Sequence, residues 1–131
     1  MINKYKAYKK VGVIDRETAT KLGFDFYGDV YASPGVLKHI IRKHGKQLTR
    51  NIKDNLTIMI ERIIGNPDYI GINKKKTDSG AIELVKRIDS YIMVILEVDI
   101  QKKYIYVASM YPVTKSKMKN KLYSGRLKVA V

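Results

Sequence analysis

The first half of the chain contains two stretches in which apolar residues recur at helical spacing. Ser33 and Pro34 form a typical helix start, an N-cap residue followed by proline at the first helical position. At about 100° per residue, one face then collects Val36, Leu37, Ile40, Ile41, His44 and Leu48. The second stretch, residues 52–64, has a similar stripe at Ile52, Leu56, Met59, Ile60 and Ile63. We therefore predict two amphipathic helices, the second ended by Gly65, Asn66 and Pro67.

After residue 67 the pattern changes to the alternation of β-strands. Strands are predicted at residues 68–73, 81–88, 91–98 and 104–111, and Pro112 should end the last one. In the strand at 81–88, one face carries Ile82, Leu84 and Ile88, and the other carries Glu83, Val85 and Arg87. Unbroken alternation in the last strand would place Ile105 and Val107 on the same face as Ser109 and Tyr111. Short connections between these strands predict an antiparallel meander.

Residues 5–14 form a further predicted strand. Asp15 then caps a short helix that Gly23 ends, and the aromatic residues 24–31 form an irregular strand. The predicted fold is α+β, with two to three helices packed on one face of a three- to five-stranded, mostly antiparallel sheet. We expect a single domain over residues 1–131, made of an N-terminal strand and helix extension (1–32), a helix-helix-meander core (33–112) and a basic C-terminal tail (113–131). The tail has room for one short helix.

The charge of the chain points to a polyanionic partner. Its 26 Lys and Arg residues against 12 Asp and Glu residues give a net charge of +14, which attracts nucleic acid. The alternative is a lysine-rich surface that serves solubility. A membrane surface is a weaker candidate, because no basic helix also carries a large aromatic or leucine face. We expect the following residues to contact nucleic acid: His39, Lys43, Lys74, Lys75, Lys76, Lys115 and Lys117.

The absence of cysteine excludes disulfides and thiolate chemistry. It fits a reducing compartment, and the first residues lack the apolar run of a signal peptide, so we expect a cytoplasmic protein. No Walker loop, no dinucleotide-binding glycine pattern and no serine nucleophile motif occurs. His39 and His44 are five residues apart, not the four that places two metal ligands on one helical face. We therefore expect neither a metal site nor a cofactor.

His44 is the first candidate for catalysis. It lies in the apolar stripe near the end of its helix, where the stripe should meet the rim of the sheet. The simplest interpretation is a core histidine with satisfied hydrogen bonds. The following Gly45, however, leaves space beside the ring, and a partly buried imidazole suits general acid or base catalysis.

The predicted strands offer four further candidates. Ser109 and Tyr111 are two residues apart and share a strand face, so that a hydroxyl could contact a phosphate and a phenol could stack on a base. Both could equally be packing residues at the edge of the core. Lys86 interrupts an apolar strand face, where it either extends to the rim or reaches into a site, and Arg87 lies on the opposite face. We expect one of these two cations to be functional.

The order of these features resembles the BECR superfamily of ribonucleases (barnase, EndoU, colicin E5/D and RelE-like), in particular its phage- and mobile-element-associated branches. The matching stretches are residues 39–45, residues 65–68 and residues 109–112, within a similar region of about residues 33–122. The resemblance implies metal-independent RNA cleavage, in which the 2′-hydroxyl attacks the adjacent phosphate. The helix histidine of the family corresponds to His44, its strand-end Thr or Ser to Ser109, and its basic strand residue to Lys86 or Arg87. Serine at 109, where threonine is more familiar, keeps the hydroxyl but loses the β-methyl that restrains its rotamer.

The sequence thus predicts a small ribonuclease that uses His44, Lys86 or Arg87, Ser109 and Tyr111, with RNA as its partner and a cognate inhibitor protein as a further expected partner. Two alternatives remain open. The first is a basic nucleic-acid-binding module without catalysis, since some members of such families lack catalytic groups. The second is a factor of a phage or mobile element whose basic surface binds an acidic protein.

Overall fold

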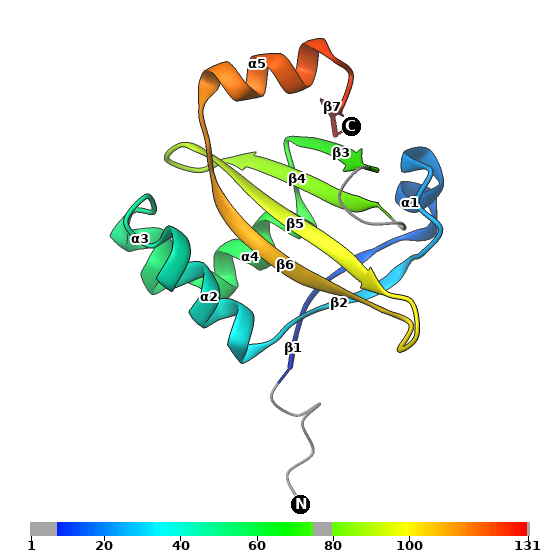
Figure 1. Ribbon diagram of the computed structural model, residues 1–131, viewed down its shortest axis with the longest axis horizontal. Helices are drawn as coiled ribbons and strands as arrows, with labels where there is room; N and C mark the ends of the chain where they lie inside the picture. Colours follow the sequence, from blue (N-terminus) through cyan, green and yellow to red (C-terminus); the bar gives the residue numbers. More distant parts are fainter. Residues whose placement is uncertain (1–7, 75–79, 131) are drawn as a thin grey trace, which may run out of the picture.

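The computed structural model describes residues 8–74 and 80–130 (Figure 1). In this part of the chain the strands are β1 (Lys9–Ile14), β2 (Gly28–Ala32), β3 (Tyr69–Asn73), β4 (Ala81–Arg87), β5 (Tyr91–Asp99), β6 (Tyr104–Val113) and β7 (Leu127–Val129). The helices are α1 (Arg16–Leu22), α2 (Pro34–His44), α3 (Arg50–Asp54), α4 (Leu56–Gly65) and α5 (Lys115–Tyr123). The α+β prediction is confirmed, but these ranges hold five helices and seven strands, more than predicted. Residues 5–7 of the first predicted strand, and residues 75–79 of the predicted turn, lie outside the described residues.

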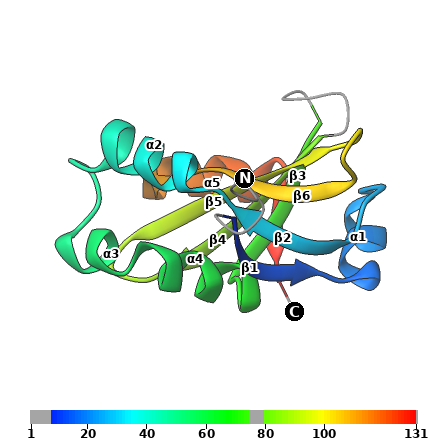
Figure 2. The ribbon, with the colours of Figure 1, turned by 90° about the horizontal axis from the view of Figure 1, so that it is seen from below.

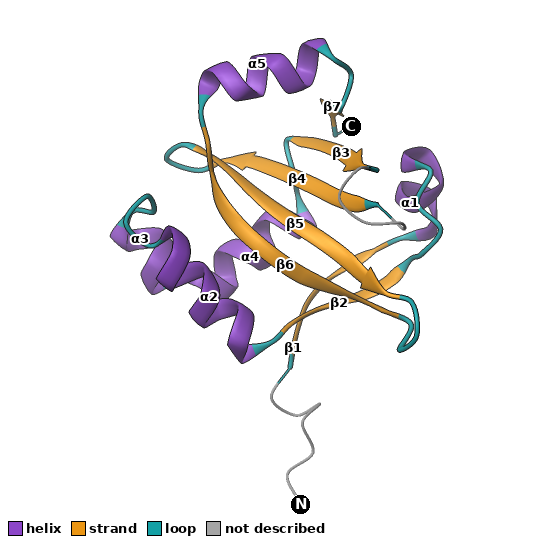
Figure 3. Ribbon diagram, viewed as in Figure 1, coloured by secondary structure: helices purple, strands orange, loops and turns teal. Residues whose placement is uncertain are grey.

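All seven strands of the described chain join one sheet in the order β1-β2-β6-β5-β4-β3-β7. The predicted meander is present, because β3 to β6 pair antiparallel in sequence order. Two additions enlarge it. The β1–β2 hairpin joins β6 through a parallel pairing at Val30 and Tyr31, and β7, from the basic tail, pairs with β3. Figure 3 shows these strands as one continuous twisted layer.

Helices pack against both faces of this sheet, not against one face as predicted (Figure 2). The larger apolar core lies between the sheet and helices α1 to α4; its fully buried side chains include Ile40, Ile52, Ile60 and Ile63. We call this side of the sheet the α4 face. The opposite side, the α5 face, carries a smaller core in which Met118 of α5 packs with Val85, Met93, Ile95 and Val113. The chain therefore buries apolar surface on two sides of its central strands.

The predicted helix starts are confirmed, but the second predicted helix is divided. Ser33 accepts a hydrogen bond from the Val36 N–H at 3.1 Å, and Asp15 accepts one from the Thr18 N–H at 2.7 Å. Between α3 and α4, Asn55 leaves helical geometry, with φ −124°. Its side-chain amide donates to a carbonyl oxygen of the preceding turn at 2.9 Å. Asparagine competes in this way with the helical backbone, and the helix bends here around the core. No helix of the described residues is long and apolar enough to cross a membrane.

A bulge in β6 corrects the prediction about its faces. The register with β5 shifts between Ile95 and Leu96, which pair with Ser109 and Val107. Ile105 and Val107 consequently point into the core on the α4 face, whereas Ser109 and Tyr111 lie on the α5 face. One extra residue reverses the alternation beyond it.

The strand β6 also continues through Pro112 to Val113, although the sequence predicted that Pro112 would end it. Strand β2 pairs with β6 only at Ile105 and Tyr106. Near Pro112, in the described part of the chain, β6 pairs with β5 on one side and its other side is unpaired. A proline is tolerated on the unpaired side of such a strand, because no ladder hydrogen bond is lost there.

Candidate active site

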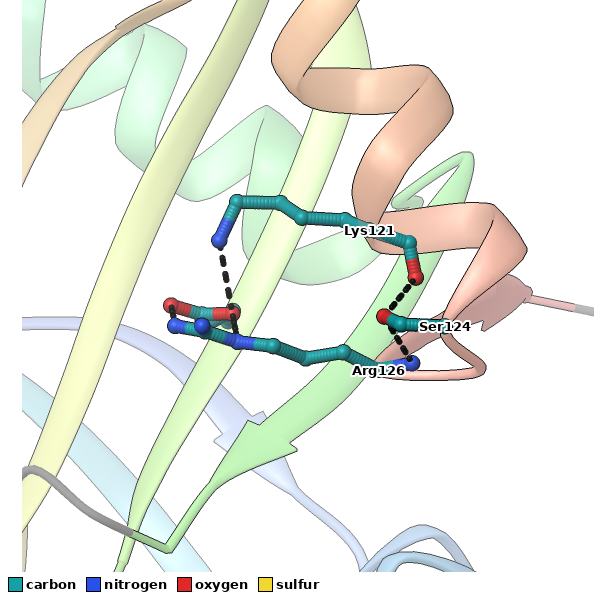
Figure 4. A network of polar contacts seen from close by, with 4 residues as sticks. Lys121, Ser124 and Arg126 are labelled. Atoms are coloured by element: carbon teal, nitrogen blue, oxygen red, sulfur yellow. Dashed lines mark hydrogen bonds and ion pairs between the residues drawn. The ribbon is translucent and has the colours of Figure 1, made fainter.

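A buried carboxylate with two cations lies on the α5 face of the sheet. The Glu83 side chain on β4 is only 2% exposed, and Arg126 donates to both of its oxygens, at 3.0 Å from Nε and 2.8 Å from Nη2. Lys121 of α5 adds its ammonium group at 3.5 Å. Figure 4 shows Lys121 and Arg126 reaching the same point over the sheet. Since two positive charges meet one negative charge, the cluster keeps a net positive charge that suits an anion.

The C-terminal segment reaches this position through local features of its sequence. Thr114 caps α5 by accepting from the Lys117 N–H at 3.2 Å, and Gly125, at φ 78°, turns the chain back after the helix. Arg126 then crosses close over β3 at Gly71, where a Cβ atom would collide with the Arg126 carbonyl oxygen. A glycine at this strand position allows the close approach that brings the guanidinium to Glu83.

His44 and Tyr111 approach this cluster from the other side of the face. Their ring centroids are 5.1 Å apart at an interplanar angle of 36°. The His44 Nδ1 atom lies 3.3 Å from the Gln47 side-chain oxygen. Because an amide oxygen only accepts, this contact favours the proton on Nδ1 and leaves Nε2 for proton exchange. His44 is half-buried and is the last residue of α2, where its ring meets Tyr111 near the end of β6.

Tyr111 contacts His44 and is close enough to Glu83 and Arg126 for their charges to affect the pKa of its phenol. Burial is the main cause that raises the pKa of its phenol, the Glu83 carboxylate raises this pKa further, and the Arg126 guanidinium lowers it in part. The phenol therefore stays protonated at neutral pH and can donate a hydrogen bond. Tyr111 thus contacts the imidazole ring and lies in the electrostatic field of the buried ion pair.

Ser109 lies in the same region of the sheet. The cross-strand row runs from Glu83 through Ile95 to Ser109, and the adjacent row ends at Tyr111. With about 4.8 Å between neighbouring strands, Ser109 and Glu83 are about 10 Å apart across the sheet. The fully buried side chain of Ile95 lies between them in this row, so Ser109 and Glu83 share a face without touching.

Lys86 and Arg87 do not join this cluster. Lys86 lies on the α4 face of β4, where its ammonium group donates a hydrogen bond to the Asn66 carbonyl oxygen at 2.9 Å and lies 3.6 Å from the Asp68 carboxylate. Arg87 is on the α5 face but farther along the strand, and its guanidinium lies over the ring of Tyr91, 5.6 Å from the centroid. Lys86 therefore ties the end of α4 to β4, and Arg87 packs at the margin of the face.

Two basic segments flank the cluster. Residues 33–53 contain six Lys and Arg residues and no acidic residue, and so do residues 114–130. The first segment includes α2, which packs along β6, and the second includes α5 (Figure 1). Lys43, Lys74, Lys115 and Lys117 are exposed and His39 is half-buried, whereas Lys75 and Lys76 lie outside the described residues. A polyanion on the α5 face would meet positive charge on both sides.

Sequence reasoning did not include Glu83, Lys121 and Arg126 among the site residues. The available signal was a single acidic residue on a strand face otherwise made of Ala81 and Val85, followed by Arg87. Such a residue looks like a solvent-facing one unless a further element is known to cover the face. Within residues 8–74 and 80–130, no three His, Asp or Glu side chains are grouped so that they could hold a metal ion.

Comparison with known proteins gives one match. The family model described as phage-Barnase-EndoU-ColicinE5/D-RelE like nuclease3 matches residues 9–120. This range contains His44, Glu83, Ser109 and Tyr111 and ends just before Lys121, so Arg126 also lies beyond it. No curated protein and no solved structure matches the chain.

Proposed function

This chain belongs to the phage-Barnase-EndoU-ColicinE5/D-RelE like nuclease3 family, and from this membership we propose that it is a metal-independent endoribonuclease. The substrate 2′-hydroxyl oxygen forms a bond to the adjacent phosphorus while the bond from phosphorus to the 5′ oxygen breaks. The products carry a 2′,3′-cyclic phosphate and a 5′-hydroxyl group. The protein has to move a proton at one or both oxygens and to stabilise charge on the phosphate.

The side chains on the α5 face suit these tasks. His44 exchanges a proton through Nε2, since Nδ1 faces Gln47. Arg126 and Lys121 stabilise the negative charge that grows on the phosphate oxygens, and Glu83 holds both cations in place. In this assignment Arg126 takes the role that the sequence gave to Lys86 or Arg87.

Two hydroxyl groups complete the site. Ser109 positions the phosphate, and the protonated phenol of Tyr111 donates a hydrogen bond to a phosphate oxygen. The observation that supports this proposal best is the position of Tyr111. Its ring contacts His44, and the charges of Glu83 and Arg126 affect the pKa of its phenol, so α2, β4, β6 and the C-terminal segment each bring a group near Tyr111.

The proposal is tested by incubating purified protein with several RNA classes in the presence of a chelator and analysing the product ends. We expect wild type to leave cyclic phosphate ends and His44→Ala to lose at least about a hundredfold in rate, the usual size of a general acid or base contribution. Equal cleavage by both proteins, or cleavage that the chelator stops, would contradict the proposal.

A second candidate function is nucleic-acid binding without catalysis. It is favoured by the saturation of Glu83, whose two oxygens are already occupied by Arg126 and Lys121, as in a purely structural ion pair that fixes α5 to the sheet. In that case RNA binding would depend steeply on salt while no cleavage occurs. A protein inhibitor or other acidic partner would then meet the same two basic segments.

A further inference from the structure

A cluster of tyrosines continues the α5 face beyond the candidate active site. We define the tyrosine cluster as Tyr8, Tyr31, Tyr104 and Tyr106. Ring centroids in it are 5.8 Å apart between Tyr104 and Tyr106, 6.1 Å between Tyr31 and Tyr104, and 6.5 Å between Tyr8 and Tyr104. These side chains come from β2, from β6 and from the residue before β1, and all four are half-buried.

The β6 bulge aligns this cluster with the site. Without it, Tyr106 and Tyr111 would lie on opposite faces, because they are five residues apart. With the bulge, Tyr106 pairs with Glu97 and Tyr31 on the same face on which Ser109 pairs with Ile95. At about 3.3 Å per residue, Tyr106 lies about 15 Å from Tyr111 along the strand. A single strand of a few nucleotides can span this distance.

The charges around the tyrosine cluster favour the bases of a nucleic acid over its phosphate backbone. Glu97 accepts a hydrogen bond from the Tyr106 hydroxyl at 3.2 Å, and Asp99 pairs with Tyr104 on the same face. Carboxylates repel phosphates, so a nucleic-acid backbone is disfavoured directly over the cluster, while aromatic rings offer stacking surfaces to bases. Lys10, the cross-strand partner of Tyr31, is held in an ion pair with Asp29 at 3.2 Å, and the two basic segments that attract the backbone are residues 33–53 and 114–130.

From this arrangement we propose that the tyrosine cluster is a base-stacking subsite that receives unpaired bases of the nucleic-acid strand held at the candidate active site. This inference rests on the proposed function, which it deepens by naming the substrate class, single-stranded RNA. In a duplex, the bases are stacked and paired, and their faces are not accessible to a flat aromatic surface. The cluster thus selects loops, ends and unpaired segments.

The test uses binding of strands that cannot undergo attack by a 2′-hydroxyl. The probes are a fluorescent single-stranded oligodeoxynucleotide of about 12 nucleotides, its abasic counterpart of equal charge, and its duplex. We expect Tyr106→Leu and Tyr31→Leu each to weaken binding of the base-containing strand by about tenfold and to leave the abasic strand unaffected. Tyr106→Phe should bind like wild type, because it keeps the ring. Tyr27→Leu, outside the cluster and in contact with Arg16, is the matched control.

Each outcome decides between the two proposals. Equal losses for the base-containing and abasic strands, or no loss in any leucine variant, would overturn the stacking subsite even if wild type cleaves RNA. Wild type that cleaves no RNA but shows the base-dependent losses would overturn the proposed nuclease and leave the subsite in place. Circular dichroism of each variant reports whether it is folded, and if one of the two leucine variants is not, the other carries the conclusion.

Discussion

The rings of His44 and Tyr111 are 5.1 Å apart, although they belong to a helix and a strand that are more than sixty residues apart in the sequence. The contact exists because β6 pairs with β2 only at Ile105 and Tyr106, which leaves its C-terminal half beside α2. A helix that packs at this edge can place its last residue over the α5 face. The fold therefore brings the His44 imidazole to the Tyr111 phenol, whose pKa is also affected by the buried Glu83–Arg126 ion pair.

The first prediction concerns the Tyr111 hydroxyl. Tyr111→Phe keeps the ring against His44 but loses the hydrogen-bond donor, so cleavage should fall by about ten- to a hundredfold, the usual range for a hydrogen bond to a charged group. Stability should change little. Tyr91→Phe, on the same face and in contact with Tyr69 and Arg87, is the control and should cleave like wild type. Single-turnover cleavage rates measure the effect; wild-type rates in Tyr111→Phe would show that the phenol is only a packing group.

The second prediction separates the structural role of the Glu83–Arg126 pair from its functional role. Arg126→Met leaves a carboxylate of 2% exposure with Lys121 alone, and should destabilise the protein by about 3 kcal/mol. The double variant Glu83→Leu/Arg126→Met removes this pair and leaves Lys121, whose flexible stem lets its ammonium group extend to solvent. It should therefore recover most of the loss, because apolar replacement of a buried pair is often neutral. Urea denaturation measures both effects.

Cleavage by the double variant then decides the role of the pair. If Arg126 stabilises charge on the phosphate, the double variant should be folded but at least about a hundredfold slower than wild type. Full cleavage activity in the folded double variant would mean that the Glu83–Arg126 pair only attaches the C-terminal segment to the sheet.

Much of the fold follows from local patterns, and the parts that do not follow depend on single residues. The start of α2 at Ser33 and the meander from β3 to β6 were predicted, because capping and alternation act over a few neighbouring positions. The break at Asn55 and the β6 bulge were not, since each depends on packing that only the complete fold provides. The three-residue strand β7 is too short to give a pattern.

The site was predictable to a similar extent. His44 was chosen as a candidate because it lies at the end of its helix stripe, and Ser109 and Tyr111 share a face as expected. Glu83 was not recognised as buried, because its burial depends on the segment after α5 that crosses its face. The roles of all these residues in cleavage stay predictions.

The third prediction is a loss of stability at high pH that depends on Tyr106. Burial, together with the Glu97 carboxylate, raises the pKa of Tyr106 to about 12 from its ordinary value of 10.0. Above about pH 10 the unfolded chain therefore releases this proton first. The contribution of Tyr106 to stability is complete below pH 10 and is lost as the pH rises towards 12.

Urea unfolding at a series of pH values measures this effect. The free energy of unfolding of wild type should fall more steeply than that of Tyr106→Phe over this range. Tyr123→Phe, whose side chain is 97% exposed, should follow wild type. Parallel curves for wild type and Tyr106→Phe would contradict the assigned shift.

The fourth prediction concerns the basic segments. If Lys43 of α2 and Lys117 of α5 each neutralise one phosphate, their substitution by alanine should reduce the slope of log affinity against log salt by about one unit each. Lys21 on α1 serves as the control, because it pairs with Glu17 at 3.2 Å. Titrations of single-stranded RNA at several salt concentrations provide the slopes. An unchanged slope in both variants would place the bound strand elsewhere on the surface.

The last prediction concerns Gly71, on which the position of Arg126 depends. A Cβ atom at this residue would collide with the Arg126 carbonyl oxygen, and backbone cannot move aside as a flexible side chain can. Gly71→Ala should therefore displace the segment that carries Arg126 and β7, lower the stability by about 1–3 kcal/mol and slow cleavage as the double variant Glu83→Leu/Arg126→Met does.

Gly65 gives the matched comparison, because nothing lies within 4 Å of a Cβ atom placed there and its backbone is helical. Gly65→Ala should be neutral or stabilise the protein by about 0.5 kcal/mol, since alanine restricts the unfolded chain more than glycine does. Melting curves and cleavage rates of the two variants test this pair of expectations. If Gly71→Ala matched wild type in both, the close crossing of β3 by Arg126 would not be what holds the guanidinium at Glu83.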